Sequence, residues 1–110
     1  MKSAVRVLIV EDDATLISAL STTLVPEFQL DSAYGESEAL GLVNQKFYGA
    51  LLVDEMLNEG SGLNVIKAAR RKWPSVPAIM ITAHATKQLV IDCLNQGVSR
   101  FLESRSKLGN

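Results

Sequence analysis

The sequence has very little cysteine and no excess of charge of either sign. Its single cysteine, Cys93, excludes an internal disulfide and fits a reducing compartment, so we expect a cytoplasmic protein. Eleven basic residues stand against twelve acidic ones, which leaves a formal net charge of -1. Such a balance gives no support for nonspecific attraction to nucleic acid or to an anionic membrane surface.

Long apolar runs are also missing. The longest, at 7–10, 50–53 and 78–81, have the length of a strand and fall far short of the roughly 20 residues that cross a bilayer. The apolar run near the N-terminus is too short for a secretory signal and continues directly into acidic residues. The chain does have 47% hydrophobic residues over 110 positions, enough for the packed core of one soluble domain without membrane contact.

Two hydrophobic periodicities alternate along this domain. Apolar runs of strand type stand at 5–10, 28–34, 50–53, 77–82 and 99–102. Between them, apolar residues at helical spacing predict helices at 16–24, 36–47, 63–73 and 86–96, with Phe47 on the apolar face of the second helix. The alternation predicts βαβ units, hence a doubly wound α/β domain with a five-stranded parallel sheet covered on both faces.

Acidic and hydroxyl side chains stand where three of these strands end. The first strand runs into Glu11-Asp12-Asp13, the third ends in Asp54 and the fourth in Thr82. Right-handed crossovers bring these ends to one edge of the sheet, where ligands of open α/β folds bind. Carboxylates gathered there repel one another unless a cation lies among them, and Mg²⁺ is the simplest choice for oxygen ligands. We predict Asp12 and Asp54 as direct ligands and Glu11 as the holder of a coordinated water.

Simpler roles are open for several of these residues. N-capping of the first helix alone explains Asp13. Asp54 on its own fits a turn after a strand, although an unpaired carboxylate at the mouth of the core is costly. Thr82 fits an ordinary β-branched strand end, and Phe101 fits a core aromatic.

Four segments stand in a characteristic order and spacing: LIVEDD at 8–13, LLVD at 51–54 with Gly62 eight residues on, AIMITA at 78–83 and GVSRFL at 97–102. Together they resemble the receiver domain, the phosphoacceptor module of two-component response regulators. The resemblance extends over residues 1–104 and implies a single flavodoxin-like domain. It leaves 105–110 as a short tail.

The resemblance also implies a role for each matching residue. Asp54 would accept a phosphoryl group from the phosphohistidine of a histidine kinase or phosphotransfer protein, which makes the chain a signalling domain and not an enzyme. Glu11, Asp12 and Asp54 would assemble the Mg²⁺ site, completed by the backbone carbonyl of Met56. Two further residues would act as a switch, the hydroxyl of Thr82 by binding a phosphoryl oxygen and the ring of Phe101 by turning inward with it.

The main departure from the family pattern is Ser104, where receiver domains carry a lysine that contacts the phosphoryl group. Serine brings no positive charge, so the charge-assisted contact is lost unless Arg105 or Lys107 reaches inward. An alternative function therefore stays open: a phosphorylation-independent pseudo-receiver that acts as a protein interaction module. A haloacid-dehalogenase-type phosphatase would need an aspartate at Met56, and a flavodoxin would need a phosphate-binding loop in place of the acidic residues after the first strand.

The tail is the second departure, because 105–110 is too short for the fifth helix of the family, which is truncated or absent. Either the natural chain continues past Asn110 into an output domain, or the sequence is trimmed, or another chain covers that face of the sheet. The last case predicts a homodimer through the fourth helix and the fifth strand. Two smaller departures are Asn58, where the family often has proline, and His84, which fits a surface loop.

Overall fold

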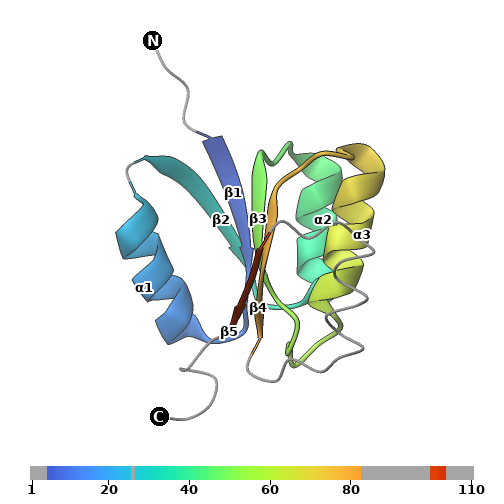
Figure 1. Cartoon of the computed structure of the whole chain (residues 1–110). Helices are drawn as coiled ribbons and strands as arrows, with labels where there is room; N and C mark the ends of the chain where they lie inside the picture. The colour runs from blue at the N-terminus through green and yellow to red at the C-terminus, as the bar shows by residue number, and fades with distance from the viewer. Residues whose placement is uncertain (1–4, 26, 83–99, 104–110) are drawn as a thin grey trace.

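The computed structural model describes residues 5–25, 27–82 and 100–103 (Figure 1). The elements follow in the order β1 (Val5–Val10), α1 (Ala14–Leu24), β2 (Phe28–Ala33), α2 (Glu36–Gln45), β3 (Ala50–Asp54), α3 (Gly62–Lys72), β4 (Ala78–Thr82) and β5 (Arg100–Glu103). The helix expected at 86–96, the fifth helix and the tail lie outside the described residues. No helix within the described ranges is long and apolar enough to cross a membrane.

The five strands form one parallel sheet in the order β2-β1-β3-β4-β5. This confirms the predicted five-stranded parallel sheet, in which β2 is an edge strand. Figure 1 shows α1 on one face of the sheet and α2 and α3 together on the other. Because the chain order reverses at β1 and β3, the carboxyl ends of these two strands border the usual ligand position of a doubly wound fold.

The core has one layer on each face of the sheet because successive strand residues point to opposite faces. On one face, side chains of β1, β3 and β4 such as Leu8, Val53 and Met80 are fully buried beneath α2 and α3. On the other face, a smaller cluster around Ile9 and Leu52 contacts one side of α1. No residue of α1 is fully buried, so the α2 and α3 side holds the larger part of the described core.

Side-chain hydrogen bonds mark the starts of α1 and α2. Asp13 is the N-cap of α1, and its Oδ1 accepts hydrogen bonds from the amides of Thr15 at 3.0 Å and Leu16 at 3.3 Å. At the start of α2, Glu38 Oε1 accepts the amide of Tyr34 at 2.9 Å. The simple N-cap interpretation of Asp13 is therefore confirmed.

The prediction that the second helix extends to Phe47 is wrong. The helix ends at Gln45 because Lys46 adopts an extended conformation, with φ -134° and ψ 160°. Phe47 therefore leaves the helix face: its side chain is 65% exposed, and its ring packs edge-on against Trp73 at 5.2 Å between centroids. Trp73 in turn is the C-cap of α3, one residue past the end of that helix.

Candidate functional site

Three carboxylates predicted from the sequence come together at the carboxyl edge of the sheet. Glu11 directly follows β1, and Asp54 is the last residue of the neighbouring β3. One carboxylate oxygen each from Glu11, Asp12 and Asp54 lies within 4.8 Å of the others. Glu11 is 1% exposed and Asp54 is fully buried, whereas Asp12 is half-buried at the rim. The group is therefore a recessed acidic cluster with one side near solvent.

Backbone amides of the adjoining loops hold each of these carboxylates in place. The amide of Asp13 donates to Glu11 Oε2 at 3.0 Å, and the amide of Met56 donates to Asp54 Oδ1 at 2.9 Å. Asp12 Oδ2 accepts the amide of Asn58 at 2.6 Å, a contact between residues 46 positions apart. Hydrogen bonds to ionised carboxylates are stronger than neutral ones, so these contacts fix the orientation of the cluster.

The cluster fits a hard divalent cation. Mg²⁺ and Ca²⁺ bind oxygen at roughly 2.0 to 2.6 Å, so two ligand atoms on opposite sides of one ion stand about 4 to 5 Å apart. The 4.8 Å limit for the three carboxylate oxygens lies within this range, but above the roughly 4.2 Å between two opposite Mg²⁺ ligands, so at least one carboxylate would hold Mg²⁺ through a coordinated water. Like charges this close inside a protein repel strongly, and a cation among them removes the repulsion. The donor set is all oxygen, as Mg²⁺ prefers.

The strand register gives the backbone positions of Thr82 and Phe101 in the sheet. Thr82 is the last residue of β4, and Asp54 pairs in register with the residue just before it, Ile81. The amide of Glu55 also donates to the carbonyl of Ile81 at 3.1 Å, which ties the ends of β3 and β4 together. Phe101 lies in β5 opposite Met80. The sheet thus brings Thr82 to the same edge as the acidic cluster.

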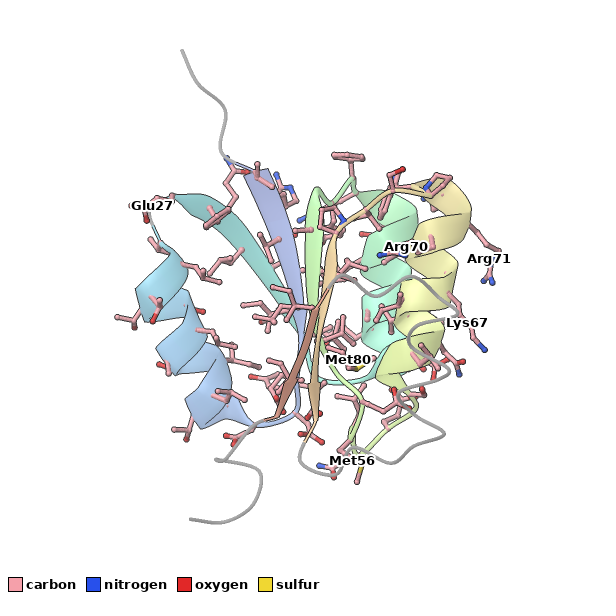
Figure 2. The ribbon with its side chains drawn as sticks, in the orientation of Figure 1. Glu27, Met56, Lys67, Arg70, Arg71 and Met80 are labelled. Atoms are coloured by element: carbon pink, nitrogen blue, oxygen red, sulfur yellow. The ribbon has the colours of Figure 1, made fainter. Side chains whose placement is uncertain are left out.

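The remaining predicted site residues are Met56, Ser104 and His84. Met56 stands two residues after Asp54. It is 47% exposed at the carboxyl edge of the sheet, where Figure 2 labels it. The part played by its backbone carbonyl stays a prediction. Ser104 and His84 lie outside the described residues, as do Arg105 and Lys107.

Sequence reasoning missed a polar network that holds the loop after Asp54. Glu55 Oε1 accepts the amide of Leu63 at 2.7 Å and the hydroxyl of Ser61 at 3.1 Å, so it caps α3 from seven residues before its start. The amide of Ser61 donates in turn to Glu36 Oε1 at 2.8 Å, in the first turn of α2. The only signal was the polar, glycine-bearing character of the segment at 55–62.

A second part of this network binds the loop to the start of α2. The carboxylate of Glu59 accepts both the amide and the hydroxyl of Ser37, each at 3.0 Å, and the amide of Glu36 donates to the Glu59 carbonyl at 2.9 Å. The hydrogen bond from the Ser37 amide is the main reason that the pKa of Glu59 is lowered. The loop at 55–61 is therefore attached to the N-termini of both α2 and α3.

Close packing beneath the cluster explains the position of Gly62. A Cβ atom at this residue would lie 2.3 Å from the carbonyl oxygen of Asp54 and 2.5 Å from Cγ1 of Val53. Real side chains do not approach a backbone oxygen so closely, and glycine is the residue that permits such an approach. The start of α3 therefore packs directly against the residue that carries the central carboxylate.

Comparison with known proteins gives consistent results. The family profile described as the response regulator receiver domain matches residues 7–108. The response regulator protein PilR of Pseudomonas aeruginosa is 32% identical over 106 residues, which cover 94% of this chain and 24% of PilR. The transcriptional regulatory protein DltR of Streptococcus agalactiae is 28% identical over 98 residues, or 88% of this chain and 44% of DltR. The chain therefore spans less than half the length of these curated relatives.

Solved structures give the same fold. A CheY-like response regulator receiver domain protein from Methanospirillum hungatei superposes with a TM-score of 0.87 at 25% identity, over 97% of this chain and 90% of that one. The non-phosphorylated HemR receiver domain from Leptospira biflexa gives a TM-score of 0.82 at 26% identity, over 90% of this chain and 81% of that one. The flavodoxin-like α/β architecture is thereby confirmed.

Proposed function

This chain belongs to the response regulator receiver domain family of two-component signalling, and on that premise we propose that Asp54 accepts a phosphoryl group at a Mg²⁺ site that it shares with Glu11 and Asp12. The observation that carries the proposal is the position of Asp54. Its carboxylate is fully buried at the end of β3, and one of its oxygens lies within 4.8 Å of oxygens of two further carboxylates. An aspartate that only forms a turn does not need two acidic neighbours at the carboxyl edge of the sheet.

The geometry supports the following transfer step. The Met56 amide fixes the rotation of the Asp54 carboxylate through Oδ1. An Asp54 oxygen attacks the phosphorus atom, the new O–P bond forms as the N–P bond of a donor phosphohistidine breaks, and the imidazole keeps that electron pair and takes up a proton. Positioning and charge neutralisation dominate phosphoryl transfer, and Mg²⁺ bound at the cluster would supply the neutralisation for the phosphoryl oxygens and carboxylates.

The neighbouring residues have supporting roles in this proposal. Glu11 and Asp12 hold the cation, directly or through water, together with the backbone carbonyl of Met56. The Thr82 hydroxyl donates to a phosphoryl oxygen, since its strand ends beside that of Asp54. Phe101, on the next strand, responds to the displacement of Thr82. Phosphorylation of Asp54 thus changes the positions of side chains on β4 and β5.

The partners follow from the same proposal. A histidine kinase or a phosphotransfer protein supplies the phosphoryl group, in the cytoplasm. Because the chain spans only 24% of PilR and 44% of DltR, an output domain beyond Asn110 is part of the proposal. A homodimer through the fourth helix and the fifth strand is the arrangement that would transmit the signal.

The test is phosphorylation by a small donor. The domain is incubated with Mg²⁺ and acetyl phosphate, and the intact mass is measured for wild type, Asp54→Asn and Glu27→Gln. Glu27 is exposed and lies at the opposite end of the molecule from the cluster (Figure 2), so its variant is the matched control. We expect one phosphoryl adduct on wild type and on Glu27→Gln, and none on Asp54→Asn. An adduct that persists in Asp54→Asn would contradict the assignment of Asp54.

A second candidate function is the phosphorylation-independent interaction module, which Ser104 favours because it replaces the lysine of the family. The two functions differ in one result. Absence of an adduct on wild type, with Mg²⁺ binding confirmed by calorimetry, would support the pseudo-receiver. If phosphorylation occurs but weakly, Ser104→Lys is expected to raise the adduct yield, because it adds a cation for the phosphoryl oxygens.

A further inference from the structure

The edge of the sheet opposite the acidic cluster carries an aromatic groove, lined by residues 47–49 and 73–77. Its walls are the segment between α2 and β3 and the segment between α3 and β4, both at the top of Figure 1. The groove has a volume of about 380 Å³, which lies within the range of protein pockets that take a ligand or a side-chain anchor. None of its residues takes part in the proposed phosphoryl transfer.

The groove exposes the aromatic ring of Phe47. This residue is 65% exposed, and its ring makes an edge-on contact with Trp73 at 5.2 Å between centroids. Tyr48, the next residue, is fully buried and contacts the same Trp73 ring at 6.4 Å. Exposed aromatic rings beside a recess are the usual energetic centres of protein interfaces.

Hydrogen bonds within the chain connect the walls of the groove to one another and to the helices beside it. Lys72 donates from Nζ to the carbonyl of Val43 at 2.8 Å and stands 5.4 Å from the centre of the Trp73 ring. Arg70 Nε donates to the carbonyl of Val76 at 2.9 Å, and the Val76 amide donates to the Trp73 carbonyl at 3.0 Å. A preformed site loses less conformational entropy when it is occupied.

Basic residues directly precede both segments that form the groove. The last turn of α3 carries Arg70, Arg71 and Lys72, and Lys46, the C-cap of α2, pairs with Asp31 at 3.3 Å. Figure 2 shows Arg71 extending outward from α3, away from the sheet. Compensation of the α3 dipole accounts for basic residues in its last turn. It does not account for the exposed ring of Phe47 beside them.

We propose that the aromatic groove binds an acidic peptide segment of a protein partner, which inserts one large apolar side chain between Phe47 and Trp73. The apolar recess takes the anchor, and Arg71 and its neighbours attract the flanking carboxylates. A single-stranded nucleic acid fits less well, because Phe47 and Trp73 meet at 77° and therefore do not form a row of parallel stacking surfaces.

The test selects peptides without prior choice of sequence. A phage-displayed library of random dodecapeptides is selected on the immobilised domain, and enriched peptides are synthesised. Binding is followed through the fluorescence of Trp73, the only tryptophan in the chain. We expect enriched peptides with one large apolar residue flanked by Asp or Glu. Enrichment of basic or purely apolar peptides, or no enrichment, would overturn the proposal.

Variants locate the binding site. Phe47→Ala is expected to weaken binding at least tenfold, and Arg71→Glu about fivefold with a weaker dependence on salt. Val25→Ala is the matched control, because Val25 is also an exposed apolar residue, at 52%, but follows α1. Equal binding by wild type and Phe47→Ala would overturn the proposal, and Arg71→Glu gives an independent result if Phe47→Ala is destabilised.

Two other occupants are distinguished by the same protein samples. Tighter binding of an oligothymidine than of the enriched peptides would identify a nucleic-acid site instead. Concentration-dependent dimers that disappear in Phe47→Ala would identify a second copy of the chain as the occupant. Since the groove is remote from Asp54, the acetyl phosphate adduct is expected to form equally in Phe47→Ala, so this proposal fails or succeeds independently of the proposed phosphorylation.

Discussion

Replacement of Gly62 by alanine measures how closely α3 packs against the residue that carries the central carboxylate. The added Cβ would lie 2.3 Å from the Asp54 carbonyl oxygen and 2.9 Å from its carbonyl carbon. Ordinary contacts of carbon atoms are about 3.5 Å or longer, so the backbone at Asp54 or at the start of α3 has to move by about 1 Å. The neighbouring atoms are backbone, which gives way less easily than the end of a flexible side chain.

The magnitude is the difference between two opposing effects. Overpacking of this kind costs up to about 3 kcal/mol. Alanine gains up to about 1 kcal/mol over glycine inside a helix, and Gly62 is the first residue of α3. We therefore expect a net loss of about 2 kcal/mol in the free energy of unfolding, which corresponds to a decrease of about 8 °C in Tm for a domain of this size.

The assay is urea unfolding of wild type, Gly62→Ala and Gly41→Ala. Gly41 lies inside α2, and a Cβ there would meet nothing within 4 Å, so its variant should gain about 0.5 to 1 kcal/mol from helix propensity alone. The adduct yield with acetyl phosphate should also decrease in Gly62→Ala, because the carboxylate is displaced. If Gly62→Ala is as stable as wild type, the close contact with Asp54 is not a constraint and the reasoning is refuted.

Three further predictions concern other contacts. Tyr48→Phe removes a hydroxyl that donates to Asp31 Oδ2 at 2.7 Å and should cost about 2 kcal/mol at neutral pH. Because that hydroxyl is the main cause of the lowered pKa of Asp31, the difference from wild type should shrink in urea unfolding as pH falls below 3.8, the ordinary value of the carboxyl. Mg²⁺ at ten times its Kd should raise the unfolding free energy of wild type by about 1.4 kcal/mol, and Asp12→Asn should reduce this gain at the same concentration. Ser61→Ala removes the N-cap hydroxyl of α3, whose Oγ accepts the Leu63 amide at 3.2 Å. Because Glu55 Oε1 also accepts that amide, at 2.7 Å, the loss of stability in thermal unfolding should be about 0.5 kcal/mol, the lower end for an N-cap.

The strands and the acidic cluster were predictable because both depend on regular features of a parallel sheet. Strands buried on both faces are nearly continuous apolar runs, and β3 is such a run with Asp54 at its end. Parallel strands joined by right-handed crossovers place all their carboxyl ends on one edge. The approach of Glu11 and Asp12 to Asp54 follows from that topology once the strands are identified.

The contacts at the opposite edge were not predictable in the same way. Phe47 stands four residues after Val43, so the apolar periodicity extends the helix to it, whereas the backbone at Lys46 turns away. The hydrogen bond between Tyr48 and Asp31 joins the segment between α2 and β3 to the edge strand β2. Such a hydrogen bond depends on the register of the sheet and on the residue at which α2 ends. Local sequence patterns predict neither of these.

The separation of charge between the two edges of the sheet follows from the same topology. The net charge of the chain does not reveal it. In a parallel α/β fold every helix begins at the carboxyl edge of the sheet and ends at the opposite edge. Carboxylates that cap helix N-termini, such as Glu55 and Glu59, therefore gather beside the acidic cluster. Basic residues that suit helix C-termini, such as Arg71 and Lys72, gather beside the aromatic groove. A formal net charge of -1 therefore describes the molecule as a whole and not the charge of either edge.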